Sequence, residues 1–191
     1  MMQCLMVAVS AASFCLTIVG LQDAGGKKQP TASVAGTAPA LPSGFFLEKE
    51  PEGAKTVEES KAAAKSGDKV VIRGRIGGSK NPFIEKRAVF TLMGAGLKAC
   101  SDDPEDKCKT PWDYCCDTAE AIAKHSATIQ VVDAEGAPLR MGLKGTNGLK
   151  ELSEVVIQGT VKEAKDKVMI LNATAMYIVP EKSVPPKSDG K

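Results

Sequence analysis

Four of the chain's six cysteines lie close together, at Cys100, Cys108, Cys115 and Cys116. Thiols form disulfides, bind soft metal ions and carry thiol–disulfide exchange, so this stretch is where chemistry is expected. Adjacent cysteines rarely bond to each other, because the small ring strains the peptide. We therefore predict two disulfides that join Cys115 and Cys116 to Cys100 and Cys108, and that clasp a polar loop with little apolar surface of its own.

A metal site is the alternative use of the same four cysteines. Four thiolates can hold zinc, and soft sulfur also suits Cu(I), although the Cys-x-x-Cys spacing of zinc knuckles and redox motifs is absent. A thiol-redox role is a further alternative. The stretch also carries carboxylates that can supply oxygen ligands to a hard cation such as calcium: Asp102, Asp103, Glu105, Asp106, Asp113 and Asp117.

Two aromatic residues accompany the cysteines. Trp112 is the only tryptophan of the chain, and Tyr114 is one of two tyrosines. They are candidate ligand contacts if they are exposed. The alternative is that they pack against the disulfides and cover one end of the domain.

Period-two hydrophobic patterns predict the strands that position this stretch. Residues 70–76 and 155–161 both alternate apolar and polar side chains, with Gly74 and Gly159 at inward positions. A glycine inside a strand permits the sharp coiling that a small barrel needs. Three more strands are predicted over residues 88–93, 127–133 and 168–179.

The order of these elements indicates the fold. Three strands, a short helical element at 149–152 and two more strands is the order of the OB-fold, a five-stranded Greek-key barrel. We therefore predict a mainly β protein with a small five-stranded OB-like barrel over residues 56–179. The cysteines then lie in an insertion between the second and third strands, residues 94–126.

Two short helices are predicted beside the barrel. An N-terminal helix begins at Thr56 and ends at Gly67, since Thr56 and Glu59 form a capping-box pattern. A second helix closes the insertion, where Asp117 can cap and Glu120 repeats the pattern.

The ends of the chain predict export. Residues 1–21 are apolar enough for a signal peptide or an N-terminal anchor, and Cys15 within them suggests a lipid-anchored alternative. Residues 22–55 are predicted to be a flexible linker and residues 180–191 a disordered tail. The predicted location is the periplasm or cell envelope, either soluble or tethered to a membrane through the N-terminus.

Composition limits the classes of function. The net charge is +2 and aromatic residues make up 4% of the chain, which argues against single-stranded nucleic acid as a partner, because such sites need basic grooves and stacking platforms. His125 is the only histidine, and no P-loop, dinucleotide or haem-attachment motif is present. We expect no enzymatic activity and no cofactor.

Basic side chains on the first strand and the following turn form a candidate ligand surface. Period-two geometry directs them away from the core, and in OB-folds this region commonly binds oligonucleotides or oligosaccharides. An anionic polymer is the candidate ligand, and the alternative is an ordinary solvated surface. The residues are Arg73, Arg75, Lys80, Lys86 and Arg87.

Three strings of the sequence together resemble a family of exported proteins of planctomycete-type bacteria, over roughly residues 69–179. They are Arg-Gly-Arg-Ile-Gly-Gly-Ser-Lys at 73–80, Thr-Pro-Trp-Asp-Tyr-Cys-Cys at 110–116 and Gln-Val-Val-Asp at 130–133. The resemblance implies export and carries no mechanism. Taken together, the sequence predicts an exported, non-enzymatic OB-like binding module. A metal-binding or thiol-redox protein and a structural envelope component are the alternatives.

Overall fold

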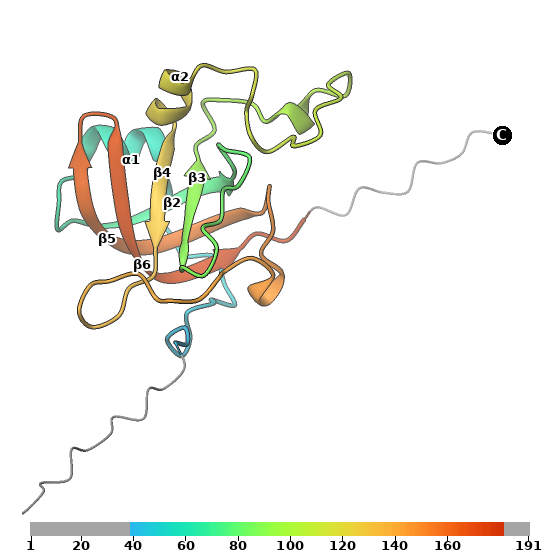
Figure 1. The fold of residues 1–191 in the computed structure, drawn as a ribbon. Helices are drawn as coiled ribbons and strands as arrows, with labels where there is room; N and C mark the ends of the chain where they lie inside the picture. The colour runs from blue at the N-terminus through green and yellow to red at the C-terminus, as the bar shows by residue number, and fades with distance from the viewer. Residues whose placement is uncertain (1–38, 182–191) are drawn as a thin grey trace, which may run out of the picture. The chain divides into compact units, whose positions relative to one another are not determined.

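Five strands close into a barrel in the computed structural model, which describes residues 39–181 (Figure 1). They are β2 (Lys69–Ile76), β3 (Val89–Met93), β4 (Ser126–Gln130), β5 (Glu154–Lys165) and β6 (Val168–Ile178). β2 pairs antiparallel with β3 and β5, β3 with β4, and β5 with β6, while β4 and β6 pair in parallel. These pairings confirm the predicted OB-like barrel.

The apolar core lies where the alternation predicts it. Ile72 and Ile76 of β2 and Phe90 and Leu92 of β3 have no exposed surface. The other strands add the equally buried side chains of Ile129, Val155, Ile157 and Leu171. Because these residues come from all five strands, the barrel is stabilised mainly by burial of apolar surface.

Two glycines let neighbouring strands approach closely. A Cβ at Gly74 would collide with the carbonyl oxygen of Met93 and the side chain of Leu92. A Cβ at Gly159 would collide with the carbonyl oxygen of Asn172, next to a register shift between β5 and β6. Their predicted role in barrel coiling is consistent with this close packing.

The N-terminal helix begins as predicted and ends earlier. Helix α1 spans Val57–Ala63, and Thr56 and Glu59 form the capping box through hydrogen bonds of 3.1 and 2.8 Å. Ala64 already has an extended backbone, so the helix stops before Gly67. Strand β1 (Lys55–Thr56) precedes it and pairs in parallel with β2.

One lysine of α1 binds three separate segments. The Nζ atom of Lys61 donates to the carbonyl oxygens of Ala123, Ser126 and Lys167, at 2.7, 2.6 and 2.6 Å. These carbonyls belong to helix α2 (Ala119–Lys124), the start of β4 and the turn between β5 and β6. Burial lowers the pKa of Lys61, and the nearby Glu58 carboxylate acts in the opposite direction.

An apolar patch within the predicted linker 22–55 docks on the barrel. Phe45 is buried, and backbone hydrogen bonds join Leu47 and Phe45 to Met176 of β6, both at 2.7 Å. The apolar side chains at 45–47 explain this contact, because packing against the barrel beside β6 shields them from water. The predicted segment 1–21, residues 22–38 of the linker and residues 182–191 of the tail lie outside the described residues, as do Cys4 and Cys15.

Two local predictions shift by a few residues. Thr118, rather than Asp117, caps α2, since its hydroxyl accepts from the Ala121 N–H at 3.1 Å. The helical turn before β5 is a 3₁₀ turn over Thr146–Gly148 rather than 149–152, and Leu149 is buried in the core. No helix within residues 39–181 has the length and apolar character needed to cross a membrane.

Candidate metal centre

The cysteines lie on the connection between β3 and β4, residues 94–125, which we call the cysteine loop. The Gly94 N–H donates to the His125 carbonyl at 2.7 Å, so the two ends of the loop are joined where β3 and β4 pair. The loop contains a 3₁₀ turn at Cys100–Asp102 and helix α2. It extends beyond the ends of β3 and β4 (Figure 1).

Two of the distinctive sequence strings form one interface that fixes the loop to the barrel. The Trp112 carbonyl accepts from the Gly78 N–H at 2.8 Å, and the Trp112 indole N–H donates to the Lys80 carbonyl at 3.0 Å. A Cβ at Gly77 would lie 2.7 Å from the same Trp112 oxygen, so the glycine permits this approach. Trp112 therefore positions the loop through both its backbone and its side chain.

Tyr114, a candidate ligand contact, is a packing residue in the structure. Only 2% of its surface is exposed, and it packs with Met93 and Ala99 in a small second apolar cluster. This burial raises the pKa of its hydroxyl. Its φ of 57° is unusual for a bulky side chain, and this conformation turns the chain sharply just before Cys115.

Two similar turns present two of the cysteines. The Oδ1 atom of Asp106 accepts from the Cys108 N–H at 2.8 Å, and the Oδ1 atom of Asp113 accepts from the Cys115 N–H at 3.0 Å. Each is an Asx turn, in which an aspartate side chain caps the backbone two residues later. The Asp-x-Cys spacing occurs twice in the sequence, and from it the structural role of these two aspartates could have been predicted.

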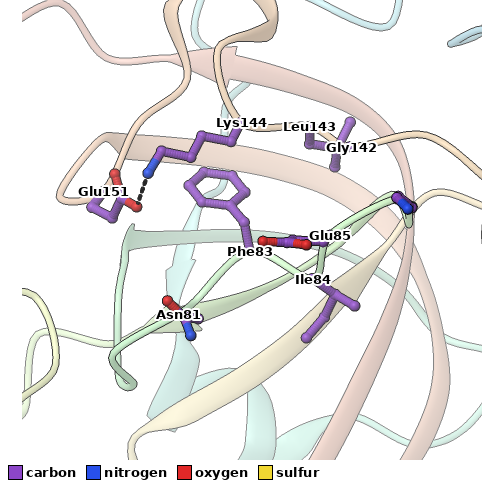
Figure 2. Close-up of a pocket in the computed structure, with 9 residues that line it drawn as sticks. Asn81, Phe83, Ile84, Glu85, Gly142, Leu143, Lys144 and Glu151 are labelled. Carbon is purple, nitrogen blue, oxygen red and sulfur yellow. Dashed lines mark hydrogen bonds and ion pairs between the residues drawn. The ribbon is translucent and has the colours of Figure 1, made fainter.

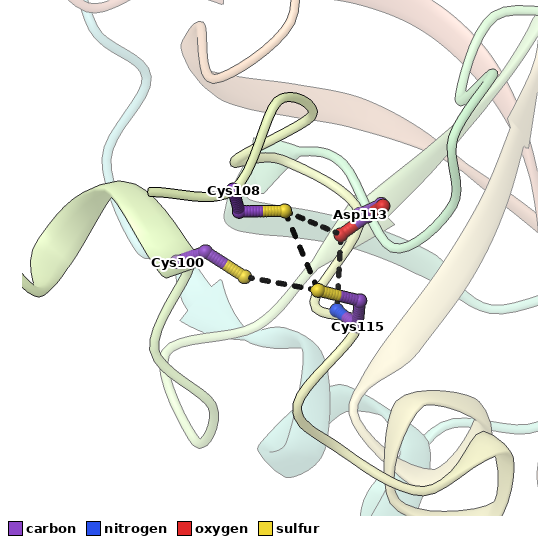
Figure 3. Close-up of side chains that lie close together, drawn as sticks. All are labelled: Cys100, Cys108, Asp113 and Cys115. Atoms are coloured by element: carbon purple, nitrogen blue, oxygen red, sulfur yellow. Dashed lines mark hydrogen bonds between the residues drawn. The ribbon is translucent and has the colours of Figure 1, made fainter. Parts of the chain in front are cut away.

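Three sulfur atoms and one carboxylate meet between these turns. The Sγ atom of Cys115 lies 3.7 Å from that of Cys100 and 3.4 Å from that of Cys108 (Figure 3). The Oδ1 atom of Asp113 lies 3.9 Å from the Cys108 sulfur. One ligand atom from each of the four residues lies within 4.8 Å of all the others.

The structure departs from the two-disulfide prediction. All four cysteines of the described chain are thiols, and the two sulfur–sulfur distances above exceed the S–S bond length of about 2.05 Å. The geometric reason is that Cys115 is close to two partners at once. The sulfurs of Cys100, Cys108 and Cys115 thus form a three-membered cluster instead of separate pairs.

The spacing of this cluster suits a tetrahedral metal ion. With Zn–S bonds of about 2.3 Å, two ligand sulfurs of a tetrahedral site lie about 3.8 Å apart. The measured sulfur–sulfur distances of 3.4 and 3.7 Å are near this value. The other ligand atoms lie within 4.8 Å of one another, so they must move closer by up to about 1 Å to share one ion.

Asp113 is oriented for such a role by Thr110. The Thr110 hydroxyl donates to Oδ2 of Asp113 at 2.6 Å, which leaves Oδ1 directed at the sulfurs. This hydrogen bond, together with the donors at Cys115 and Cys108 and against the effect of burial, lowers the pKa of Asp113. A carboxylate that is ionised and held by a second residue is the usual arrangement around bound metal.

Cys116 belongs to a different group. Its sulfur, the sulfur of Cys100 and a carboxylate oxygen of Asp106 lie within 4.8 Å of one another. Cys100 is thus shared by both groups and is buried, whereas Cys115 and Cys116 are exposed. The thiols of Cys108 and Cys100, which hydrogen-bond to Cys115, raise the pKa of Cys115.

The two predicted ligand-binding arginines of β2 have carboxylate partners. Arg73 pairs with Glu50 and Glu154, both at 2.6 Å. Arg75 donates to both oxygens of Asp102, at 2.8 and 2.9 Å, and so ties the turn that carries Cys100 to the barrel. These partners already neutralise the positive charge that an anionic ligand would need.

The other predicted cations, Lys80, Lys86 and Arg87, are all exposed. Lys86 lines an open hollow of about 570 Å³ that contains neither Arg73 nor Arg75. Figure 2 shows this hollow, where Lys144 pairs with Glu151 at 2.5 Å. Asn81, Phe83, Ile84, Glu85, Gly142 and Leu143 complete its lining.

The only histidine lies at the base of the loop, hydrogen-bonded to a carboxylate. The Nδ1 atom of His125 is 2.8 Å from Oε1 of Glu58 in α1, and the same oxygen accepts from the Gly96 N–H at 3.1 Å. Burial acts to raise the pKa of Glu58, but the hydrogen bonds from His125 and Gly96 lower it overall. This pair joins α1 to the start and end of the loop.

Together these features define an OB-like β-barrel with a thiol–carboxylate cluster in the loop between its second and third barrel strands. No family model and no curated protein matches the chain. Among solved structures the chain is similar to an aspartyl tRNA synthetase from Entamoeba histolytica, at 17% identity and a TM-score of 0.39. The match covers 78% of this chain and 28% of the synthetase, and a likeness at this level says nothing about ligands.

Proposed function

We propose that the protein is a non-enzymatic binding module whose binding element is the cysteine loop, and that its ligand is a thiophilic divalent metal ion such as zinc. One observation carries the proposal: Cys100, Cys108, Cys115 and Asp113 offer four ligand atoms within 4.8 Å of one another. Four is the coordination number that zinc takes in structural sites. The metal alternative from the sequence is therefore favoured over a loop clasped only by disulfides.

The electrostatics of the cluster support a cation. If all four groups ionise, the cluster carries a charge of −4 in a small volume, and a divalent ion removes half of it. Without a cation, the hydrogen bonds of Cys108 and Cys100 raise the pKa of Cys115, and burial raises the pKa of Cys100, so ionising these two thiols is unfavourable. Metal binding would therefore release protons.

The donor set also indicates what the ion does. Three thiolates and one carboxylate fill a tetrahedral shell, whereas catalytic zinc keeps a position open for water or substrate. A filled shell supports a binding or structural role and not hydrolysis. Export to the cell envelope and binding of an anionic polymer stay predictions, and the second has lost the support of Arg73 and Arg75, which are paired with carboxylates.

Cobalt and zinc titration of the reduced full-length chain tests the proposal. We expect one ion per chain, with the visible absorption of tetrahedral Co²⁺ and thiolate charge-transfer bands that disappear when zinc is added. Asp113→Asn and Cys115→Ser should each weaken binding. Thr110→Val, which removes only the hydroxyl that orients Asp113, should weaken binding about 10–100-fold, the usual effect of losing a group that holds a metal ligand in place.

Asp103→Asn is the matched control, because Asp103 is an exposed carboxylate of the same loop outside both ligand groups. It should bind cobalt like the wild type. Octahedral spectra, or equal binding by wild type and Cys115→Ser, would contradict the proposal.

A further inference from the structure

The four cysteines can be joined as two pairs of neighbouring sulfurs, although Cys115 lies close to both Cys108 and Cys100. Cys108 and Cys115 have the shortest measured sulfur–sulfur distance, 3.4 Å. Cys100 and Cys116 lie within 4.8 Å of each other, on the side where Asp106 completes the second group. Together these two pairs use every cysteine of the loop.

The other two ways of pairing are less favourable. Joining Cys100 to Cys115, 3.7 Å apart, would leave Cys108 with Cys116, and these two sulfurs occur in different ligand groups. Joining the adjacent Cys115 and Cys116 would strain the peptide between them. Only the first arrangement forms two bridges from sulfurs that are already neighbours.

Building on the proposed function, we infer that the metal centre is redox-switched: oxidation forms the bridges Cys108–Cys115 and Cys100–Cys116 and expels the ion. The two states exclude each other, because Cys100, Cys108 and Cys115 are metal ligands in one and are all bonded to sulfur in the other. A disulfide sulfur has no thiolate charge with which to hold zinc.

The oxidant is a low-molecular-weight disulfide, RSSR, two molecules of which are consumed per chain. A protein thiolate attacks one sulfur of RSSR and breaks its S–S bond. This step expels RS⁻ and forms a mixed disulfide between the protein and RS. The partner cysteine then attacks the protein sulfur of that mixed disulfide and releases the second RS⁻. Each bridge oxidises two protein sulfurs and reduces one RSSR to two RS⁻, which take up protons from the solvent because the zinc-bound cysteines are already thiolates. The metal leaves with its oxidation state unchanged.

Exposure sets the order of attack. Cys115 and Cys116 are exposed, Cys108 is half-buried and Cys100 is buried. The exposed cysteine of each pair therefore reacts with the oxidant first, and Cys108 and Cys100 complete the bridges from inside the loop. Tyr114, held in its buried conformation, places the two exposed cysteines directly after it.

The test treats the zinc-loaded full-length chain with oxidised glutathione and follows zinc with a chromogenic chelator. We expect release of one zinc per chain as two bridges form. Free thiols are then alkylated and the chain is cut with trypsin. Cleavage at lysine separates the cysteines into three peptides, residues 99–107, 108–109 and 110–124, which the two bridges should hold together.

The variant Cys115→Ser distinguishes the pairings. The inferred pairing predicts that peptide 99–107 stays linked to 110–124 through Cys100 and Cys116, and that Cys108 is alkylated. The rival pairing predicts the reverse, with Cys108 bridged to Cys116 and Cys100 alkylated. The second result would overturn the inference.

The outcomes also separate the inference from the proposed function. A chain that binds zinc and retains it while both bridges form would overturn the switch and leave the metal proposal intact. A reduced chain that binds no zinc would overturn the proposed function and the switch with it, and the peptides would still show which cysteines pair.

Discussion

The barrel and the cysteine loop of the same chain are held by different interactions. Side chains from five strands meet in one apolar core in the barrel, where Ile72, Phe90 and Leu92 have no exposed surface. The loop has only the small cluster around Tyr114, and half of its residues are exposed. Its order depends on Asx turns, on the contacts of Trp112 and on the Arg75–Asp102 pair. Burial of apolar surface can therefore stabilise the barrel, whereas the loop is ordered mainly by hydrogen bonds and an ion pair.

The largest expected effect on stability comes from a substitution in the barrel core. Phe90→Ala removes a fully buried ring and should lower the free energy of unfolding by about 3–5 kcal/mol. Urea unfolding followed by circular dichroism measures this change. The barrel and loop should unfold together in this variant, since the loop is attached to β3. A loss below about 1 kcal/mol would contradict the assignment of Phe90 to the core.

A second variant tests the close approach of the strands. Gly74→Ala adds a Cβ against the Met93 carbonyl and should destabilise by about 1–3 kcal/mol, the cost of overpacking a dense interior. Gly142→Ala is the matched control, because its new Cβ would meet only the Lys86 nitrogen, at 3.9 Å. The comparison uses the same urea midpoints. Equal stability of the two variants would show that β2 and β3 have room for a side chain at this position.

The pair at the base of the loop predicts a pH dependence. Because the pKa of Glu58 is lowered below its usual 4.5 in the folded protein, its carboxylate stabilises the fold above that pH. The contribution is lost as the pH falls through the lowered value. Glu58→Gln should cost about 1 kcal/mol at pH 7 and converge with the wild type in acid. Urea midpoints from pH 3 to 7 measure this, and a constant difference across that range would exclude the carboxylate as its source.

The smallest expected effect concerns the ion pair between β2 and the loop. Arg75 and Asp102 are each more than a third exposed, so their coupling energy should be only about 0.5 kcal/mol. A double-mutant cycle with Arg75→Ala and Asp102→Ala measures it. The same double-mutant cycle can be measured by cobalt affinity, which tests whether the barrel affects the loop. Each single variant should weaken metal binding slightly, since the pair positions the turn that carries Cys100. Arg73→Ala is the control, because its partners lie outside the loop.

Strand alternation was enough to predict the barrel. The inward residues of 70–76 and 88–93 were correctly assigned, because a period of two is a local property that each strand carries by itself. The capping box at Thr56 was equally local. The cysteine cluster was harder, since which sulfurs meet depends on the fold of residues 94–125 and not on spacing. The pairing of Arg73 and Arg75 was missed for the same reason, because Glu50, Asp102 and Glu154 are distant in the chain.

Lys61 has a consequence for local motion. Its ammonium group shares three protons among carbonyls of α2, β4 and the β5–β6 turn. The β5–β6 turn is far in sequence from α2 and β4, which follow each other directly, and would otherwise fray separately from them. With one shared cation, opening any of them disturbs the hydrogen bonds of the others, so their backbone amides should exchange with deuterium as one cooperative unit. Replacing Lys61 by Met, which keeps much of the side-chain length and removes the donors, should let each segment exchange at its own faster rate.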